Sequence, residues 1–358
     1  MKKILIANIF GIGDVLFTTP LIANIKRAIE GVSIDYVCNA RCRDLVSMMP
    51  EVEKTYIYEK DFYTDLWKRS KPDFFKALGG FFSDIRKNKY DAYFDFTLSR
   101  ESGLFYALAG IPRRIGLDYK KRGLFLTEKI SLEGFEERHV IEYYLDLLAL
   151  IGVPVSEREM QIVPEEPSLE WARSYLEGKV DSPERIVVMI PGGGASWGQQ
   201  ASRKRWHSEG FVRAADMLTA EGMQIAVFGD SSERELCLEI AGKMKTAPVI
   251  VENDLGIKEY AALLSLMDLA VCNDGGPLHM AVALGVSTVS IFGPVDDRVY
   301  GPYPLSSKHR VVSSTEAVCR PCYNRFKLPD CEYDIKCLTD IKPETVAGAC
   351  MEVLAKSV

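Results

Sequence analysis

The sequence predicts an α/β protein built from two doubly wound parallel sheets. Its 358 residues exceed the size of one ordinary domain. Short apolar, β-rich runs alternate with helical patterns, as in a parallel sheet whose strands are buried on both faces. The composition, 47% hydrophobic and 26% charged, is typical of a globular chain.

The first half contains four strand-like runs and the helices between them. The runs lie at 3–9, 33–39, 54–59 and 92–97, and the helical pattern after the first run covers 19–30. Between the third and fourth runs, residues 60–89 are aromatic and basic, which predicts one or two helices packed on this half. The rhythm is that of a doubly wound fold.

A second series of runs follows at 185–193, 223–230, 248–254, 269–274 and 288–294. Pro164 and Pro167 precede a fresh helical pattern, so we place the boundary there. The expected parts are an N-terminal domain over 1–165, a C-terminal domain over 166–345 and a terminal helix over 346–358. This helix could pack back on the N-terminal domain.

Charge and hydropathy exclude several classes of protein. The net charge of −6 argues against a general nucleic-acid binder, so we expect no nucleic-acid partner. No apolar run approaches the ~20 residues of a membrane helix, and the basic start lacks a signal-peptide cleavage site. We therefore expect a cytoplasmic protein without a transmembrane segment.

The turn after the first strand contains Gly11 and Gly13, but Leu16 stands where a dinucleotide fingerprint needs its third glycine. Asp35, about twenty positions on, keeps dinucleotide binding as a minor alternative. Asp14 begins the next helix at the carboxyl edge of the sheet. It is either a helix cap or a group that accepts a proton from a bound hydroxyl.

The segment 269–294 points to a bound anion. A strand ends at Asp274, Gly275, Gly276 and Pro277 make a turn, and a helix expected to start near Leu278 carries His279. Backbone N–H groups at such a helix start favour a phosphate, and His279 can donate to one. Gly293 forms a second glycine turn beside the first. A buried core histidine is the alternative for His279, and we assign Asp274 first to shaping the turn.

A triple glycine at 192–194 ends another strand, and Lys204 follows it before the next helix. A cation near a glycine turn can neutralise a leaving phosphate. Taken alone, the segment around Lys204 fits a solvated basic helix start better.

The motifs GDVLFTTP, PGGGAS with KRW, and NDGGPLHMAVALGVSTVSIFGP resemble those of the ADP-heptose:lipopolysaccharide heptosyltransferase family, in order and spacing along nearly the whole chain. The resemblance implies the GT-B fold, two Rossmann-like domains facing across a cleft, and inverting transfer of a sugar from a nucleotide donor. It places the general base on Asp14 and the donor-phosphate lysine on Lys204. The diphosphate turn falls on Asp274, Gly275, Gly276 and His279, and a ribose contact falls near Glu233.

The resemblance implies a lipopolysaccharide core acceptor at the inner-membrane surface. It therefore also allows peripheral association of the protein with the inner face of the cytoplasmic membrane. Residues 110–123 concentrate basic side chains, and Arg113, Arg114 and Lys120 are the candidate acceptor contacts. A solvated basic loop is the alternative. The chain has no Asp-x-Asp pair, so we expect no cofactor requirement for donor binding.

Four of nine cysteines cluster as Cys319, Cys322, Cys331 and Cys337. In a reducing compartment such a group favours a structural zinc ion over disulfides, although the second spacing is wider than in standard zinc modules. The alternative is a loop that needs no metal.

Two further function classes remain open. A sugar-nucleotide epimerase of the same two-domain fold would also bind a diphosphate at a glycine-rich helix start. A dinucleotide oxidoreductase or nucleotide-binding protein is disfavoured by the missing third glycine.

Overall fold

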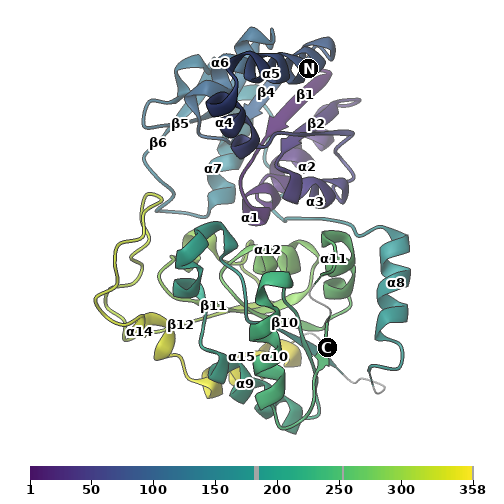
Figure 1. Cartoon of the computed structure of the whole chain (residues 1–358), viewed down its shortest axis with the longest axis vertical. Helices are drawn as coiled ribbons and strands as arrows, with labels where there is room; N and C mark the ends of the chain where they lie inside the picture. The colour runs from purple at the N-terminus through teal and green to yellow at the C-terminus, as the bar shows by residue number, and fades with distance from the viewer. Residues whose placement is uncertain (181–184, 252–253, 357–358) are drawn as a thin grey trace. The chain divides into compact units, whose positions relative to one another are not determined.

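The computed structural model describes residues 1–180, 185–251 and 254–356, which form two compact units (Figure 1). The first unit consists of Met1–Phe135 and Val140–Arg158, and the second consists of Glu136–His139 and Glu159–Val358. The chain therefore passes to the second unit slightly before the expected boundary at 165. A short segment, 136–139, also belongs to the second unit.

The first unit contains a six-stranded parallel sheet with the order β3-β2-β1-β4-β5-β6. Its central strand β1 pairs with β2 on one side and β4 on the other. The strands are β1 Lys3–Ala7, β2 Ser33–Cys38, β3 Lys54–Ile57, β4 Ala92–Asp95, β5 Arg113–Tyr119 and β6 Glu128–Leu132.

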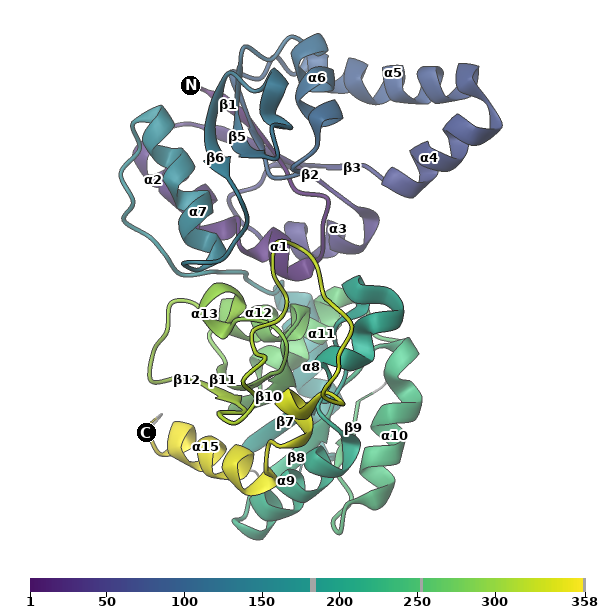
Figure 2. The same ribbon diagram turned by 90° about the vertical axis from the view of Figure 1, so that its left-hand side faces the viewer.

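Helices flank this sheet, and α4 and α5 correspond to the expected aromatic and basic helices (Figures 1 and 2). The α-helices are α1 Ile12–Leu16, α2 Thr19–Ala28, α3 Arg43–Ser47, α4 Lys60–Arg69, α5 Lys71–Lys87, α6 Arg100–Leu108 and α7 Val140–Asp146. The 3₁₀ turns are η1 Ala40–Cys42, η2 Gly123–Phe125 and η3 Leu147–Ile151.

The second unit repeats the architecture with the strand order β12-β11-β10-β7-β8-β9, again parallel. The strands are β7 Ile186–Ile190, β8 Gln224–Val227, β9 Val249–Ile250, β10 Leu269–Asn273, β11 Ser287–Phe292 and β12 His309–Ser313. Residues 252 and 253 of the expected strand over 248–254 lie outside the described residues.

The helices of the second unit connect these strands. They are α8 Glu166–Leu176, α9 Ser208–Ala220, α10 Arg234–Lys243, α11 Ile257–Ser265, α12 Gly276–Ala283, α13 Asp297–Tyr300, α14 Lys336–Thr339 and α15 Pro343–Ala355, with 3₁₀ segments η4 Ala195–Lys204 and η5 Ser231–Glu233. Within the described ranges, no helix has both the length and the apolar character needed to cross a membrane.

The two doubly wound sheets confirm the predicted fold class, but the sequence interpretation misses three strands. β5, β6 and β12 lie toward the outer sides of their sheets and carry polar side chains such as Arg114 and Arg310, so they lack a continuous apolar run.

The terminal helix also differs from its expectation. Val346, Cys350 and Leu354 of α15 are buried in one core cluster with residues of β7, α9 and β11, all in the second unit. The helix is therefore part of the core of that unit. Residues 357 and 358 lie outside the described residues.

Each sheet reverses its strand order at its first strand in sequence. β1 lies between β2 and β4, and β7 lies between β8 and β10. In doubly wound folds, ligands bind at the carboxyl ends of the strands at such a reversal point. The two glycine-rich turns therefore lie where this rule places binding sites.

Candidate functional site

In the first unit, two buried asparagines fix the turn that carries Asp14. Asn8, directly after β1, donates from Nδ2 to the Asp14 carbonyl (2.8 Å) and accepts the Phe10 N–H at Oδ1 (3.1 Å). Asn39, after β2, donates from Nδ2 to the carbonyls of Ile9 (3.0 Å) and Phe10 (2.6 Å). The turn is thus held by side chains from two neighbouring strands.

The Asp14 carboxylate lies in the first turn of α1 and is partly exposed. Its Oδ2 accepts the N–H of Gly11 (3.2 Å), so the helix-cap interpretation correctly describes one of its contacts. Burial, and then the negative charge of Asp14, raise the pKa of the neighbouring Tyr144 well above its ordinary value. The carboxylate therefore combines a fixed position with access to solvent.

In the second unit, the glycine loop after β7 meets the turn after β10. Gly193 and Gly194 have φ of 99° and 77°, left-handed values that favour glycine. A Cβ on Gly275 would lie 3.4 Å from the Gly194 nitrogen, so the two backbones are in close approach. This arrangement concentrates backbone N–H groups and leaves little side-chain bulk.

Lys204, at the end of η4, is buried and forms an ion pair with Asp274, whose Oδ2 lies 2.5 Å from Nζ. The ammonium also lies 4.4 Å from the ring centroid of Trp197. Lys204 is therefore not the solvated helix start that its local sequence allows. It is a buried cation held beside the glycine turns.

The helix α12 starts at Gly276, slightly earlier than expected, with Pro277 in its first turn. His279 is buried in this helix. Burial, and after it electrostatic interaction with His139 and Lys204, lowers the pKa of His279 well below its ordinary value. The imidazole is thus neutral at pH 7, and it can donate one hydrogen bond but adds no charge.

Glu233 supports the glycine loop from the side. Its Oε1 accepts the Gly193 N–H (2.6 Å) and pairs with Arg205 (3.0 Å), whose Nε donates to the Gly193 carbonyl (2.9 Å). A Cβ on Gly192 would lie about 2 Å from the Glu233 carboxylate, so only glycine leaves room for it. These contacts give Glu233 a positioning role; the ribose contact implied by the resemblance stays a prediction.

The sequence interpretation did not single out Asn273, which connects three parts of this site. Its Oδ1 accepts the Trp206 N–H (2.9 Å), and Nδ2 donates to the carbonyls of Pro191 (2.8 Å) and Gly192 (3.0 Å). A polar residue at the end of an otherwise apolar strand is the signal that could have identified it, and the same holds for Asn8.

The candidate acceptor residues fall at opposite edges of the first sheet. Arg113 and Arg114 begin β5, whereas Lys120 directly follows it, at the carboxyl edge where Asp14 follows β1. Arg113 also forms a two-pronged pair with Glu128 (2.8 and 2.7 Å). Because the strands are parallel, the structure groups Lys120 with Asp14 but separates both arginines from it.

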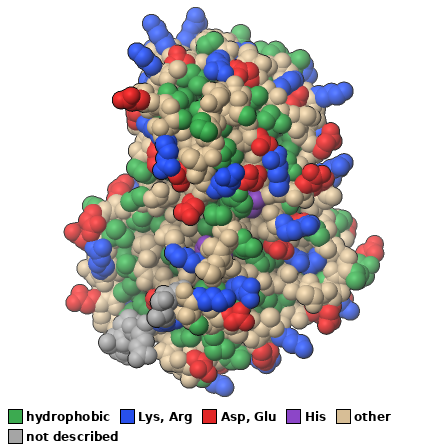
Figure 3. Space-filling model, turned by 180° about the vertical axis from the view of Figure 1, so that it is seen from behind, with side chains coloured by type: hydrophobic (Ala, Val, Ile, Leu, Met, Phe, Trp, Pro, Cys, Tyr) green, Lys and Arg blue, Asp and Glu red, His purple; other side chains and the backbone are tan. Residues whose placement is uncertain are grey.

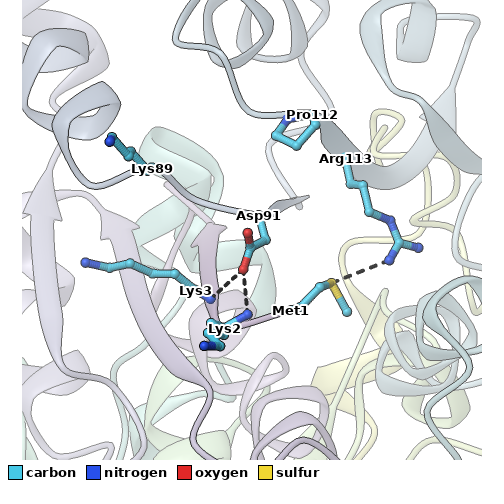
Figure 4. A pocket seen from close by; sticks show the side chains of 7 residues that line it. All are labelled: Met1, Lys2, Lys3, Lys89, Asp91, Pro112 and Arg113. Atoms are coloured by element: carbon cyan, nitrogen blue, oxygen red, sulfur yellow. Dashed lines mark hydrogen bonds between the residues drawn. The ribbon is translucent and has the colours of Figure 1, made fainter.

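A shallow depression marks the amino-terminal edge of the same sheet (Figure 4). Asp91 accepts the backbone N–H groups of Lys2 (2.5 Å) and Lys3 (3.0 Å) there, which fixes the start of β1. Arg113 lines the depression and donates to the Met1 sulfur (3.5 Å). These contacts hold the start of the chain against the sheet. The depression lies at the edge of the sheet opposite the Asp14 turn.

Gly293 is buried against the side chain of Leu338, since a Cβ there would come within 2.6 Å of it. Its carbonyl accepts a hydrogen bond from Arg320 (3.0 Å). The structure thus shows a packing role for Gly293, and its assignment to the donor site stays a prediction.

All four clustered cysteines are free thiols. Burial and the nearby thiols of Cys322, Cys319 and Cys331 raise the pKa of Cys337 to about 11, so the four groups interact electrostatically. Among the described residues, however, no group of three or more His, Cys, Asp or Glu side chains is arranged to hold a metal ion.

Comparison with known proteins identifies heptosyltransferases among the relatives of this chain. A family model described as glycosyltransferase family 9 (heptosyltransferase) matches residues 79–331. Lipopolysaccharide heptosyltransferase 2 of Escherichia coli (strain K12) is 26% identical over 320 residues, covering 87% of each chain. Lipooligosaccharide heptosyltransferase 2 of Campylobacter jejuni serotype O:2 is 31% identical over 245 residues, covering 67% of this chain and 70% of that protein.

The solved structure of the E. coli ADP-heptose lps heptosyltransferase II shares the fold. It has a TM-score of 0.76 at 22% identity and covers 100% of this chain and 99% of its own.

The substitution Gly192→Ala tests the packing of the glycine loop. The new methyl group would displace the Glu233 carboxylate, so we expect the free energy of unfolding to fall by about 1–3 kcal/mol in urea titrations. Gly242→Ala, in α10 with open space around it, is the matched control and should leave stability unchanged or slightly raised. Equal effects of the two variants would contradict this description of the loop.

A double-mutant cycle tests the Lys204–Asp274 pair. Lys204→Met leaves a buried carboxylate without its cation, which should lower the free energy of unfolding by about 3–5 kcal/mol. Lys204→Met combined with Asp274→Asn removes both charges and should recover much of that loss. If the double variant is as unstable as the sum of the two single variants, the two groups are not coupled.

Proposed function

The chain belongs to glycosyltransferase family 9, the heptosyltransferase family, as its motifs predict, and we propose that it transfers a heptosyl group from a nucleotide sugar to a lipopolysaccharide core acceptor. The family model covers more than half of the chain, and the curated relatives named above are heptosyltransferases. The observation that carries the proposal is the buried Lys204 beside the glycine turns of the second unit.

The glycine turns and Lys204 suit a nucleoside diphosphate. The start of α12 presents backbone N–H groups and the positive end of a helix dipole, and Gly275 lets a bulky anion approach. Lys204 supplies the positive charge, and the neutral His279 can donate one hydrogen bond. The resemblance to an ADP-heptose-dependent enzyme supports ADP-heptose as the donor.

Inverting transfer is a single in-line displacement at the anomeric carbon of the donor sugar. The Asp14 carboxylate takes the proton of the acceptor hydroxyl, and the acceptor oxygen forms a bond to that carbon. The bond from the carbon to the diphosphate oxygen breaks, and the diphosphate leaves with the electron pair. Lys204 and the α12 amides stabilise the charge that develops on the leaving group. The proposal requires Asp14 and the donor to meet at one anomeric carbon.

The proposed acceptor site is supported by fewer residues than the proposed donor site. Lys120 follows β5 at the same sheet edge as the Asp14 turn, and its ammonium can bind a carboxylate or phosphate of the core oligosaccharide. Since such an acceptor is attached to lipid, the enzyme would act at the inner face of the cytoplasmic membrane.

A sugar-nucleotide epimerase is the less supported alternative. The curated relatives named above are transferases. An epimerase would return an epimerised nucleotide sugar, and addition of an acceptor would not cause it to release free nucleotide. Acceptor-dependent release of ADP from ADP-heptose, together with mass spectrometry of the heptosylated product, distinguishes the two functions. Release that is independent of acceptor would overturn the transferase proposal.

A structural metal ion at the four clustered cysteines is a separate part of the proposal. The spacing of Cys319 and Cys322 and the mutual influence of the four thiols support it. Among the described residues, the four thiols are not arranged as a group that could hold a metal ion, so binding would require them to rearrange. Element analysis of the purified protein by mass spectrometry decides this point.

Replacing Asp14 by asparagine tests the proposed base. Asp14→Asn retains the shape of the side chain but cannot take a proton, so kcat should fall by about 10²–10⁴-fold. Calorimetric affinity for ADP-heptose should change little. Asp44→Asn, a carboxylate in the first turn of α3, is the matched control and should keep wild-type activity. Near-normal turnover of Asp14→Asn would refute the assignment.

Replacing Lys120 by glutamine tests the acceptor contact. Loss of one exposed charge should raise the acceptor KM by about two- to five-fold, with little effect on kcat or on donor affinity. Lys89→Gln, at the opposite edge of the same sheet, removes an equal charge and should leave the kinetics unchanged. Equal acceptor KM values for both variants would remove Lys120 from the site.

A further inference from the structure

Helices α4 and α5 form a hairpin that extends outward from the sheet of the first unit (Figure 2). Ser70 separates the two helices and caps α5 by accepting the Asp73 N–H at Oγ (3.4 Å). Pro72 lies in the first turn of α5, where its missing N–H is not needed. The connection is therefore short and locally defined.

The base of the hairpin packs on the sheet through aromatic rings. Tyr63 of α4 stacks on Tyr58 (4.7 Å between ring centroids), and Phe81 of α5 packs against both Tyr58 (5.5 Å) and Tyr56 (6.2 Å). Ile85 is fully buried in the core. The base can thus hold the outer end of the hairpin, residues 67–76, in a fixed place.

The tip, residues 67–76, exposes aromatic side chains. Trp67, Phe74 and Phe75 form a cluster with ring centroids 5.0, 5.9 and 5.3 Å apart. Trp67 is 44% exposed and Phe75 is 61% exposed. Exposing so much aromatic surface costs free energy, and clusters of this kind mark interaction sites.

The tip is also strongly basic in an acidic chain. Its four basic residues are Lys68, Arg69, Lys71 and Lys76, and Asp73 is its one acidic residue, while the whole chain carries −6. The Lys71 ammonium lies 5.2 Å from the ring centroid of Trp67. By contrast, Lys and Arg alternate with Asp and Glu on the face drawn in Figure 3.

We propose that the tip binds the surface of a lipid bilayer that contains anionic lipid. Aromatic rings favour the interfacial zone of a bilayer, and neighbouring Lys and Arg side chains are attracted to anionic headgroups. The proposal deepens the proposed function, on which it rests, because it places the first unit beside a lipid-linked acceptor. A second copy of the chain fits less well, since two tips would oppose basic residues to basic residues.

Vesicle flotation tests the proposal without any acceptor present. Wild-type protein should float with vesicles of phosphatidylcholine containing phosphatidylglycerol and much less with phosphatidylcholine alone. Trp67→Ser with Phe75→Ser, and separately Lys68→Gln with Lys71→Gln, should each reduce binding by about ten-fold or more. Leu305→Ser, an exposed apolar residue of the second unit, is the control and should bind as the wild type does.

Several outcomes would overturn the proposal. The wild type could fail to float with any vesicle, or it could bind neutral and anionic vesicles equally. Both tip variants could also bind as strongly as the wild type. Concentration-dependent dimerisation in sedimentation that the tip variants abolish would assign the surface to a second copy instead. Trp67 fluorescence gives an independent signal, because its emission should shift to the blue on binding vesicles and Trp67→Phe should abolish that shift.

Activity on a delipidated core acceptor separates this proposal from the proposed function. The tip variants should keep wild-type kcat and KM on that acceptor and lose activity on the same acceptor in anionic vesicles. Loss of activity on both would indicate a folding defect or a catalytic role of the tip. Vesicle binding without any transfer would retain the docking surface and reject the transferase.

Discussion

The ion pair between Lys204 and Asp274 is the contact on which the candidate donor site of the second unit depends. Two charges removed from water are tolerated only when each satisfies the other, so the pair fixes the end of η4 against the turn after β10. It keeps a cation in place beside two glycine turns whose backbone N–H groups can donate hydrogen bonds to an anion. Pairing with Lys204 also reduces the repulsion that the Asp274 carboxylate would otherwise exert on a nearby phosphate.

Both units position their functional turns with asparagine side chains at strand ends. Asn8 and Asn39 hold the turn that leads to Asp14, and Asn273 holds the glycine loop and Trp206. An asparagine can donate and accept at once, so it satisfies backbone groups that a loop leaves unpaired. The position of each loop is therefore set by the strand ends of its own sheet, for the carboxylate of Asp14 in the first unit and for the backbone N–H groups of the glycine loop in the second.

The sequence predicts those features that depend on local pattern. Apolar runs identify the inner strands, and glycines between a strand and a helix identify the turns around Asp14 and Gly275. The sequence does not show whether a basic stretch is a loop or a strand. Arg113 and Arg114 begin the strand β5, so they lie at the amino-terminal edge of the sheet, whereas Asp14 lies at the carboxyl edge. Nor can the sequence show that Glu233 reaches the Gly193 loop 40 residues earlier, because that contact depends on how β7 and β8 are paired.

The most direct measurement is the calorimetric affinity of ADP and of adenosine for the wild type and for Lys204→Met, at a temperature where both are folded. If Lys204 neutralises a bound diphosphate, the variant should bind ADP at least about ten-fold more weakly, while its affinity for adenosine is unchanged. Equal ADP affinities, or an equal loss for adenosine, would contradict the assignment of the diphosphate site to the buried lysine and the glycine turns.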